Sequence, residues 1–245
     1  MNRLQLLGVE GLPEVQPGDD LGELISSRAK LEAGDVIVVA QKVVSKSEGR
    51  IVDLNTVTAT PRATEIASRL IAKPDPRMVQ VVLDESVRVL RSERVLITET
   101  PHGFVCANSG VDHSNVGDRS AVTLLPLDPD ASALRLCARL RELSGAEVSV
   151  IISDTFGRPW RLGIVNVALG ISGLPAALDL RGSLDDDGKA LTATVLAIAD
   201  DLASAAGILM GKTARTPAVI VRGTNMRGNG SGRDLIRPEG EDLFR

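Results

Sequence analysis

The amino-acid sequence predicts an α+β fold in which mixed sheets pack against helices. Helix-like and strand-like hydrophobic patterns follow one another without the strict strand–helix–strand alternation of a doubly wound parallel sheet. No internal repeat and no break in composition marks a domain boundary. At 245 residues, 43% hydrophobic and 24% charged, the chain has the composition of an ordinary globular protein. We therefore expect one domain over residues 1–245. If this domain consists of two subdomains, the sequence does not show where one ends and the other begins.

The first half of the chain contains both kinds of element. Residues 21–31 have helical spacing after the cap candidates Asp19 and Asp20, and Gly34 ends the pattern. An apolar run at 35–40 indicates a buried strand. The remaining predictions here are a short helix at 64–72, a mostly helical stretch at 75–89, and a hairpin of strands 95–98 and 103–107.

The second half has the stronger helix signals. Residues 131–143 form an amphipathic pattern, and residues 148–152 indicate a second buried strand. The longest helix signal covers 191–210, where apolar side chains fall roughly on one face. A final strand is predicted at 218–221. The Gly-, Asn- and Arg-rich stretch 223–232 is typical of a loop.

Charge and composition exclude several classes of protein. The formal net charge of −4 argues against general affinity for nucleic acid. No run of roughly 18 apolar residues predicts a membrane-spanning helix, and the acidic N-terminal region does not fit a signal peptide. The two cysteines, Cys106 and Cys137, suggest neither a disulfide framework nor a CxxC metal pair. We expect a cytoplasmic protein without nucleic-acid or membrane partners.

Two aspartates are the candidate metal ligands. Asp112 lies in Gly-Val-Asp-His-Ser-Asn (110–115) and Asp154 in Ser-Asp-Thr-Phe-Gly-Arg-Pro-Trp-Arg (153–161), each at or near the end of an apolar run. Two such carboxylates make a hard oxygen site suited to Mg²⁺ or Mn²⁺, and such a metal would most plausibly hold phosphate. Thr155 and Asn115 would complete the oxygen shell or contact phosphate. The alternative is that these residues cap turns or bond to nearby backbone.

Basic residues supply candidate anion contacts. Lys42, Lys46 and Arg50 recur every fourth position after a buried strand, although Val43, Val44 and Gly49 weaken a helix there. They are either phosphate-binding cations at a strand exit or a solvated basic edge. Residues 207–213 resemble a phosphate loop but have three residues between the glycines instead of four, and they close a helix.

Further candidate functional side chains follow Asp154 in the sequence or lie elsewhere in the chain. Arg158 and Arg161 would suit a substrate with carboxylates or phosphates. Trp160, the single Trp, would stack on a ring or, as is more common for its type, pack in the core. Cys106 is expected to be a small buried hydrophobe rather than a nucleophile. His102 and His113 lack metal-ligand spacing and receive no catalytic role.

Several long motifs occur in the order of a known family. They are residues 11–14, 44–49, 97–116, 152–161 and 231–238, and the similarity runs from about Leu6 to Arg245. These motifs resemble those of coenzyme F420-0:L-glutamate ligase, also called coenzyme F420:γ-glutamyl ligase, in its stand-alone form. The resemblance implies a GTP-dependent ligase of deazaflavin cofactor biosynthesis that adds L-glutamate to F420-0, often followed by a second γ-linked glutamate. It also implies an unusual α+β ligase fold that forms an intertwined homodimer.

The resemblance implies roles for individual residues as well. Asp112, Asp154 and Thr155 would bind two divalent ions, Mg²⁺ or Mn²⁺, and K⁺ is an additional candidate. Lys212 stands where archaeal members place an oxygen ligand for the second metal, and it would bind phosphate instead. Contacts to GTP would come from the following residues: Leu12, Pro13, Glu14, Val15, Gln41, Lys42, Lys46, Asn115, and the segment 210–217 with Met210, Gly211, Lys212 and Thr213.

The hypothesis for the reaction is activation of a carboxylate by GTP. Asp112 and Asp154 would hold the metal across the β- and γ-phosphates, and transfer of the γ-phosphoryl to F420-0 would make an acyl phosphate that the glutamate amine attacks. Arg158, Arg161 and Lys46 are the candidate anion clamps. One alternative is a related carboxylate–amine ligase with another substrate. A more distant one is a non-catalytic protein that binds GTP and metal.

Overall fold

The protein is described by a computed structural model that covers residues 3–112, 120–211 and 214–242. Its centre is a five-stranded sheet with the order β1-β12-β2-β8-β9. Only the central pair β2–β8 is parallel, and the other neighbours are antiparallel, so the sheet is mixed. The predicted α+β class is therefore confirmed. The strands are β1 (Gln5–Gly8), β2 (Val36–Ala40), β8 (Ser149–Arg158), β9 (Arg161–Ser172) and β12 (Ala218–Arg222).

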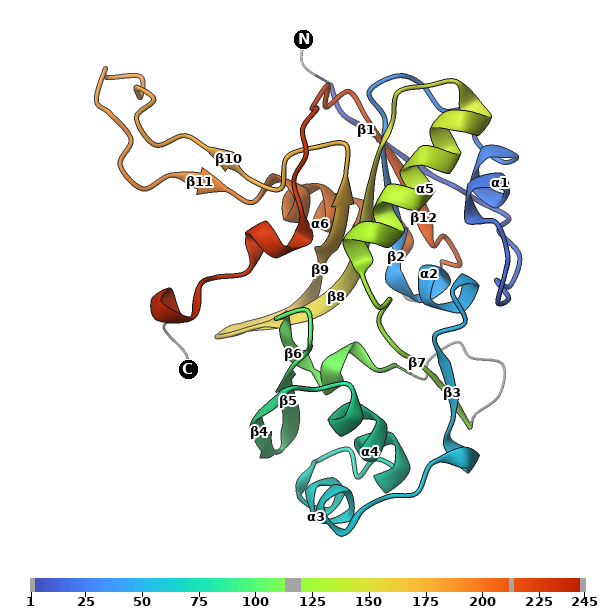
Figure 1. Cartoon of the computed structure of the whole chain (residues 1–245). Coiled ribbons are helices and arrows are strands. Elements are labelled where there is room, and N and C mark those ends of the chain that lie inside the picture. Colours follow the sequence, from blue (N-terminus) through green and yellow to red (C-terminus); the bar gives the residue numbers. More distant parts are fainter. Residues whose placement is uncertain (1–2, 113–119, 212–213, 243–245) are drawn as a thin grey trace.

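Helices cover both faces of this sheet (Figure 1). Helices α1 (Leu21–Ser26) and α5 (Pro129–Ser144) pack on one face, where Ile37, Val150 and Ile152 meet Leu140. Helix α6 (Ile198–Met210) packs on the other face against Val38 and Ile151. Strand alternation explains this division, because successive residues of β2 and β8 point to opposite faces and both faces are buried.

A second group of elements has a core of its own below the sheet (Figure 1). Leu54, Val82, Leu96 and Val122 are among its buried side chains. A short antiparallel pair, β3–β7, joins this group to the main sheet, and β4-β5-β6 form a small antiparallel sheet. The elements are β3 (Ile51–Asp53), α3 (Pro61–Arg69), α4 (Pro76–Asp84), β4 (Arg88–Glu93), β5 (Val95–Glu99), β6 (Val105–Ala107) and β7 (Ala121–Thr123).

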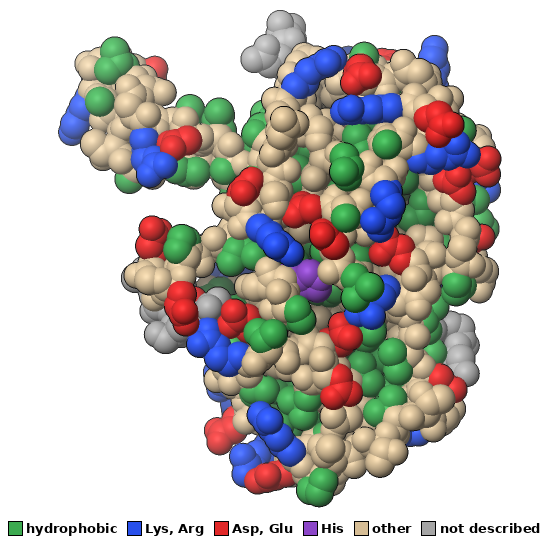
Figure 2. All heavy atoms as spheres, in the orientation of Figure 1, with side chains coloured by type: hydrophobic (Ala, Val, Ile, Leu, Met, Phe, Trp, Pro, Cys, Tyr) green, Lys and Arg blue, Asp and Glu red, His purple; other side chains and the backbone are tan. Residues whose placement is uncertain are grey.

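The remaining elements link these parts. Helix α2 (Gln41–Ser47) follows β2 without an intervening loop. Strands β10 (Leu178–Asp179) and β11 (Val195–Leu196) form the base of an arm that stands away from the body in Figures 1 and 2. Within the described residues, no helix combines the length and the apolar character that crossing a membrane requires. Short 3₁₀ helices occur at Leu54–Thr56, Asn108–Gly110, Gly232–Leu235 and Glu239–Glu241.

Several predicted boundaries were wrong. The signal at 191–210 becomes a helix only from Ile198, and residues 195–196 pair as a strand, so α5 and not α6 is the longest described helix. The stretch 75–89 is helical only to Asp84 and then enters β4. The first helix ends at Ser26. The hairpin around residues 101–103, the buried strands, the final strand and the loop at 223–231 are confirmed.

Candidate functional site

The candidate site lies where the two parallel strands of the sheet end. Ala40 of β2 pairs with Ser153 of β8, so Gln41 and Asp154 are the next residues along their strands at the same edge of the sheet. Carboxyl ends of adjacent parallel strands commonly form ligand sites in α/β proteins. The structure therefore brings the predicted basic segment and the second predicted aspartate together from positions more than one hundred residues apart.

Asp112 lies close to the same edge, where its side chain forms an ion pair with Lys42. Its carboxylate Oδ2 lies 2.9 Å from the Lys42 ammonium nitrogen. The backbone of Asp112 is fixed by a bridge to Thr123, in which Asp112 N donates to Thr123 O at 3.1 Å and Thr123 N donates to Asp112 O at 2.8 Å. Lys42 thus holds one candidate ligand carboxylate at the start of α2, beside the strand that carries the other.

The pKa of Cys106 shows that β6 also borders Asp154. Burial of the thiol, together with the negative charge of Asp154, raises this pKa to about 12. Cys106 is 6% exposed, so the prediction of a small buried hydrophobe is confirmed. The Asp154 charge is therefore close enough to the Cys106 thiol of β6 to disfavour a second negative charge there.

Asp154 and Thr155 occupy opposite faces of β8. In register, Asp154 pairs with Val167 and Thr155 pairs with Asn166 on β9. The Asn166 amide donates to Ser153 Oγ at 3.3 Å and to Met210 Sδ at 3.4 Å, which places the Thr155 face beside the end of α6. Adjacent residues of a strand point to opposite faces. We therefore expect Asp154 and Thr155 to bind two different metal ions rather than one ion together. The sequence patterns had not singled out Asn166.

Several of the residues predicted to contact GTP lie on or beside α2, whereas Met210 and Gly211 lie at the end of α6. Lys46 is 5% exposed and forms an ion pair with Glu14 of the 12–15 segment. Gln41 is buried, and its side-chain oxygen accepts a hydrogen bond from Ser45 at 2.8 Å. Pro217 O accepts a hydrogen bond from Ala40 N at 2.8 Å, so the end of the 210–217 segment runs beside the start of α2. Asn115, Lys212 and Thr213 lie outside the described residues.

The three basic residues of this region do not form a solvated basic edge. Lys42 and Lys46 have carboxylate partners in Asp112 and Glu14. Arg50 lies beyond the helix, donates to Leu125 O at 3.0 Å, and pairs with Glu85 at 2.7 Å. Helix α2 forms despite its two valines, and it brings Lys42 and Lys46 to one side of the sheet edge while Arg50 serves the packing of the second core.

The arginines after Asp154 sit farther out. Arg158 and Arg161 are cross-strand neighbours in the register of β8 and β9, at the tip of this hairpin. Four residues of strand separate Arg158 from Asp154, which is about 13 Å. The Arg158 Nη2 donates to Leu162 O at 3.0 Å, and no described atom bonds its buried Nε. Trp160 is 84% exposed in the turn, so the expectation that it packs in the core was wrong.

The donors at the sheet edge suit a hard metal ion better than a soft one. Among the described residues, no group of three or more His, Cys, Asp and Glu side chains forms a metal cluster. The candidate ligands Asp112, Asp154 and Thr155 offer only carboxylate and hydroxyl oxygen, and Mg²⁺ and Mn²⁺ prefer such oxygen ligands. The arrangement fits a metal ion that takes its remaining ligands from water or phosphate.

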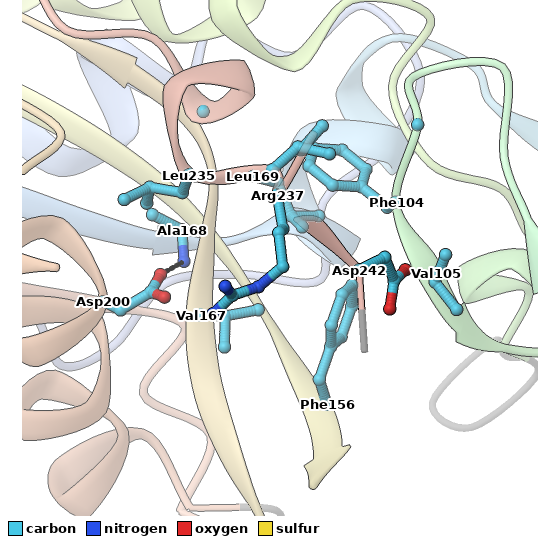
Figure 3. A pocket seen from close by; sticks show the side chains of 13 residues that line it. Phe104, Val105, Phe156, Val167, Ala168, Leu169, Asp200, Leu235, Arg237 and Asp242 are labelled. Atoms are coloured by element: carbon cyan, nitrogen blue, oxygen red, sulfur yellow. Dashed lines mark hydrogen bonds between the residues drawn. The ribbon is translucent and has the colours of Figure 1, made fainter. Parts of the chain in front are cut away.

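A pocket of about 280 Å³ lies against the β8–β9 hairpin (Figure 3). Phe156 and Val167 line it, and they share the strand face of Asp154. The N-terminal turn of α6 contributes Asp200, whose carboxylate accepts from Ala168 N at 2.8 Å and whose pKa is raised by burial. The C-terminal segment contributes Arg237. Sequence reasoning missed this pocket, because its walls come from five separate stretches of chain.

Comparison with known proteins covers nearly the whole chain. The family model described as F420-0:Gamma-glutamyl ligase matches residues 11–223. Proteins named coenzyme F420:L-glutamate ligase are similar over full length: one from Archaeoglobus fulgidus is 48% identical over 99% of this chain and 97% of its own length. Those from Methanopyrus kandleri and Methanothermobacter thermautotrophicus are 46% identical (100% of both chains) and 44% identical (99% of both). The chain therefore belongs to the F420-0:γ-glutamyl ligase family.

Proposed function

We propose that this chain joins L-glutamate to F420-0 through an amide bond, with GTP as the energy source, in coenzyme F420 biosynthesis. The observation that carries the proposal is the full-length similarity to relatives that are named coenzyme F420:L-glutamate ligase. The sheet edge agrees with it, because Asp154 follows the end of the β2–β8 pairing, and the lysines of α2, with the carboxylates of Asp112 and Glu14, follow β2 there. Addition of a further γ-linked glutamate would use the same chemistry on the product.

The metal-binding role falls to Asp112, Asp154 and Thr155. Their oxygen-only donor set fits Mg²⁺ or Mn²⁺. When bound, the metal would neutralise phosphate charge and align the γ-phosphoryl group. Lys42 holds the Asp112 carboxylate in place before the nucleotide arrives. Because Thr155 lies on the α6 face of β8, it would serve the second of the two ions expected for this family.

The basic side chains would stabilise the transferring phosphoryl group. Lys42 and Lys46 lie at the start and middle of α2 and would exchange their carboxylate partners for phosphate oxygens. Arg158 has a buried Nε that no described atom bonds, so an anionic group could complete its hydrogen bonding. The contribution of these residues is positioning and electrostatic stabilisation.

The chemistry follows from the poor reactivity of a free carboxylate with an amine. The F420-0 carboxylate oxygen would form a bond to the γ-phosphorus as the bond from that phosphorus to the β-phosphate oxygen breaks, which releases GDP. The glutamate nitrogen would then attack the acyl carbon, lose a proton, and expel inorganic phosphate. Each turnover would convert one GTP to GDP and phosphate.

A homodimer is part of the proposal. The tip of the β8–β9 hairpin exposes Trp160 (84%), Leu162 (98%) and Ile164 (55%). The arm, which leaves the other end of β9, exposes Leu184, Val195 and Leu196. Extended apolar hairpins of this kind aggregate unless a partner covers them, and a second copy of the chain would do so.

The test is an incubation of the purified protein with GTP, L-glutamate, F420-0 and Mg²⁺ or Mn²⁺, followed by mass spectrometry. A mass gain of one glutamyl unit per F420-0, matched by release of phosphate, is the expected result. Phosphate release with another carboxylate and amine, but not with F420-0, would point to a related ligase. GTP binding without phosphate release under any pair of substrates would point to a non-catalytic nucleotide-binding protein.

A further inference from the structure

The pocket adjoins the face of the β8–β9 hairpin that carries Asp154. Phe156 follows Asp154 by two residues on the same face of β8, about 7 Å along the strand. Val167, the cross-strand partner of Asp154, lines the pocket as well. A molecule in this pocket would therefore lie directly beside the aspartate assigned to phosphoryl transfer, and one end of it could reach that aspartate.

The walls of the pocket are aromatic and aliphatic. Phe104 and Phe156 meet edge to face, with ring centroids 6.4 Å apart and planes at 76°. Leu169 and Ile236 pack with these rings. Such a surface favours a flat ring, because aromatic side chains gain from stacked or edge contacts in addition to the burial of apolar area. Free glutamate has little apolar surface to bury here.

The far wall of the pocket is held in place by Asp130. Its carboxylate accepts from Gly232 N at 2.9 Å, from Ser231 Oγ at 2.5 Å and from Ile171 N at 2.8 Å. Gly232 lies so close to β9 that a Cβ atom there would stand 2.0 Å from Leu169 O. The C-terminal segment is thus fixed against the edge of the sheet, and this contact positions Leu235 and Arg237 at the pocket.

Three charged side chains, those of Asp200, Arg237 and Asp242, line the pocket beside the apolar walls. In Figure 3 the Arg237 side chain extends across the pocket, with Asp200 on one side and Phe104 and Asp242 on the other. Within the part of the chain that the structure describes, Arg237 forms no ion pair with a carboxylate. Asp200 accepts one backbone hydrogen bond and keeps a second oxygen toward the pocket. The pocket can therefore recognise a flat molecule with both hydrogen-bond acceptors and donors on its rim.

We infer that this pocket binds the deazaflavin ring of F420-0, with Phe104 and Phe156 against the ring and Arg237 on an oxygen at its rim. The inference rests on the proposed function, since it assumes that F420-0 is the substrate. At about 280 Å³ the pocket is close to the lower limit for small-molecule sites, roughly 300 Å³. It therefore holds the ring system only, and the tail with the reacting carboxylate leaves it along β8 toward Asp154.

The experiment separates ring binding from catalysis. A deazaflavin riboside keeps the ring but lacks the reacting carboxylate, and its fluorescence anisotropy reports binding without GTP or metal. We expect wild-type protein to bind it, and Arg237→Gln and Phe156→Leu to weaken binding about tenfold. Arg233→Gln is the matched control, because Arg233 is exposed on the same segment and does not line the pocket. Thermal melting shows whether each variant is folded.

Steady-state kinetics give the second readout. Arg237→Gln should raise the KM for F420-0 about tenfold and leave the KM values for GTP and glutamate unchanged. If wild-type protein elongates F420-0 but both pocket variants bind the riboside normally, the assignment of this pocket to the deazaflavin ring is wrong while the proposed function stands. If Arg237→Gln raises only the KM for glutamate, the pocket binds the amino acid and the inference is overturned. If wild-type protein does not elongate F420-0 at all, the proposed function itself fails.

Discussion

At the scale of single residues, the two aspartates differ in how tightly the fold constrains them. Asp112 is held by the Lys42 ammonium, whereas Asp154 lies on a buried strand against the apolar wall of Cys106. The sequence singles out both as candidate ligands, because each sits beside hydroxyl or amide groups near the end of an apolar run. It could not show that Lys42 pairs with Asp112, or that Lys42 and Asp154 follow neighbouring strands, since both depend on tertiary contacts such as the parallel pairing of β2 and β8.

Substitution of Asp154 by Asn tests the metal assignment. The change keeps the size of the side chain but removes the charge, so turnover should fall by at least about a hundredfold while the fold is retained. Binding of Mn²⁺, measured by electron paramagnetic resonance, should weaken in parallel. Asp186→Asn, in the exposed arm, is the control and should leave both quantities unchanged. Wild-type turnover and Mn²⁺ affinity in Asp154→Asn would refute the assignment.

Cys106 provides a pH-dependent probe of the same neighbourhood. Burial, and secondarily the charge of Asp154, raise its pKa from 9.0 to about 12. At pH 8 only about one thiol in ten thousand is then ionised, and the ionised fraction grows tenfold for each pH unit up to that value. Alkylation by iodoacetamide, followed by peptide mass, should be slow at pH 8. In Asp154→Asn the pKa should fall, because a repelling charge is gone, and labelling should become faster at equal pH. Unchanged labelling would show that the Asp154 charge does not contribute measurably to this pKa.

Trp160 shows why burial of a single residue is hard to predict. The frequency with which Trp is buried favoured the core, but Trp160 lies between Pro159 and Arg161 and adopts a positive φ of 57° in a hairpin turn. The turn itself depends on the pairing of β8 with β9. The twelve-residue strand β9 escaped prediction because its apolar and polar residues alternate only in part, with a bulge near Ser153.

At the scale of elements, pairing partners explain the errors in the helix predictions. Residues 191–197 continue the apolar spacing of α6, yet Val195 pairs with Asp179 and Leu196 with Leu178 in the arm. The β-branched Thr192, Thr194 and Val195 also favour a strand over a helix. Where local pattern and tertiary pairing agreed, as in β2 and α5, the predicted and observed bounds differ by only one or two residues.

The ion pair of Arg222 and Asp35 joins β12 to the start of β2, and its loss should be costly. Asp35 is fully buried, and Arg222 donates to its two oxygens through Nε and Nη2, both at 2.8 Å. Arg222→Met would leave an unpaired buried carboxylate and lower the free energy of unfolding by about 3–5 kcal/mol, measured with urea. Arg135→Met, which breaks the exposed pair with Glu48, should cost less than about 1 kcal/mol. Equal losses in the two variants would contradict this role.

At the scale of the whole molecule, the site is assembled from both parts of the fold. Strand β8 of the main sheet supplies Asp154, helix α2 after β2 supplies Lys42, and the segment that follows the small β4-β5-β6 sheet supplies Asp112. The α+β class followed from the sequence because it requires only the kinds and order of elements. The strand order β1-β12-β2-β8-β9 did not, because it joins the two ends of the chain through contacts that no local pattern encodes.

The exposed hairpin tip leads to a prediction about assembly. Trp160 and Leu162 are 84% and 98% exposed, and burial of such side chains between two copies would stabilise a dimer. Wild-type protein should have twice the chain mass of 25.8 kDa in light scattering. Leu162→Asp places a charge in the contact and should shift the protein toward the mass of one chain. Leu127→Asp, at another exposed leucine away from the hairpin, should remain dimeric. A monomeric wild type, or a Leu162→Asp variant that stays dimeric at micromolar concentration, would show that this tip does not hold two copies together.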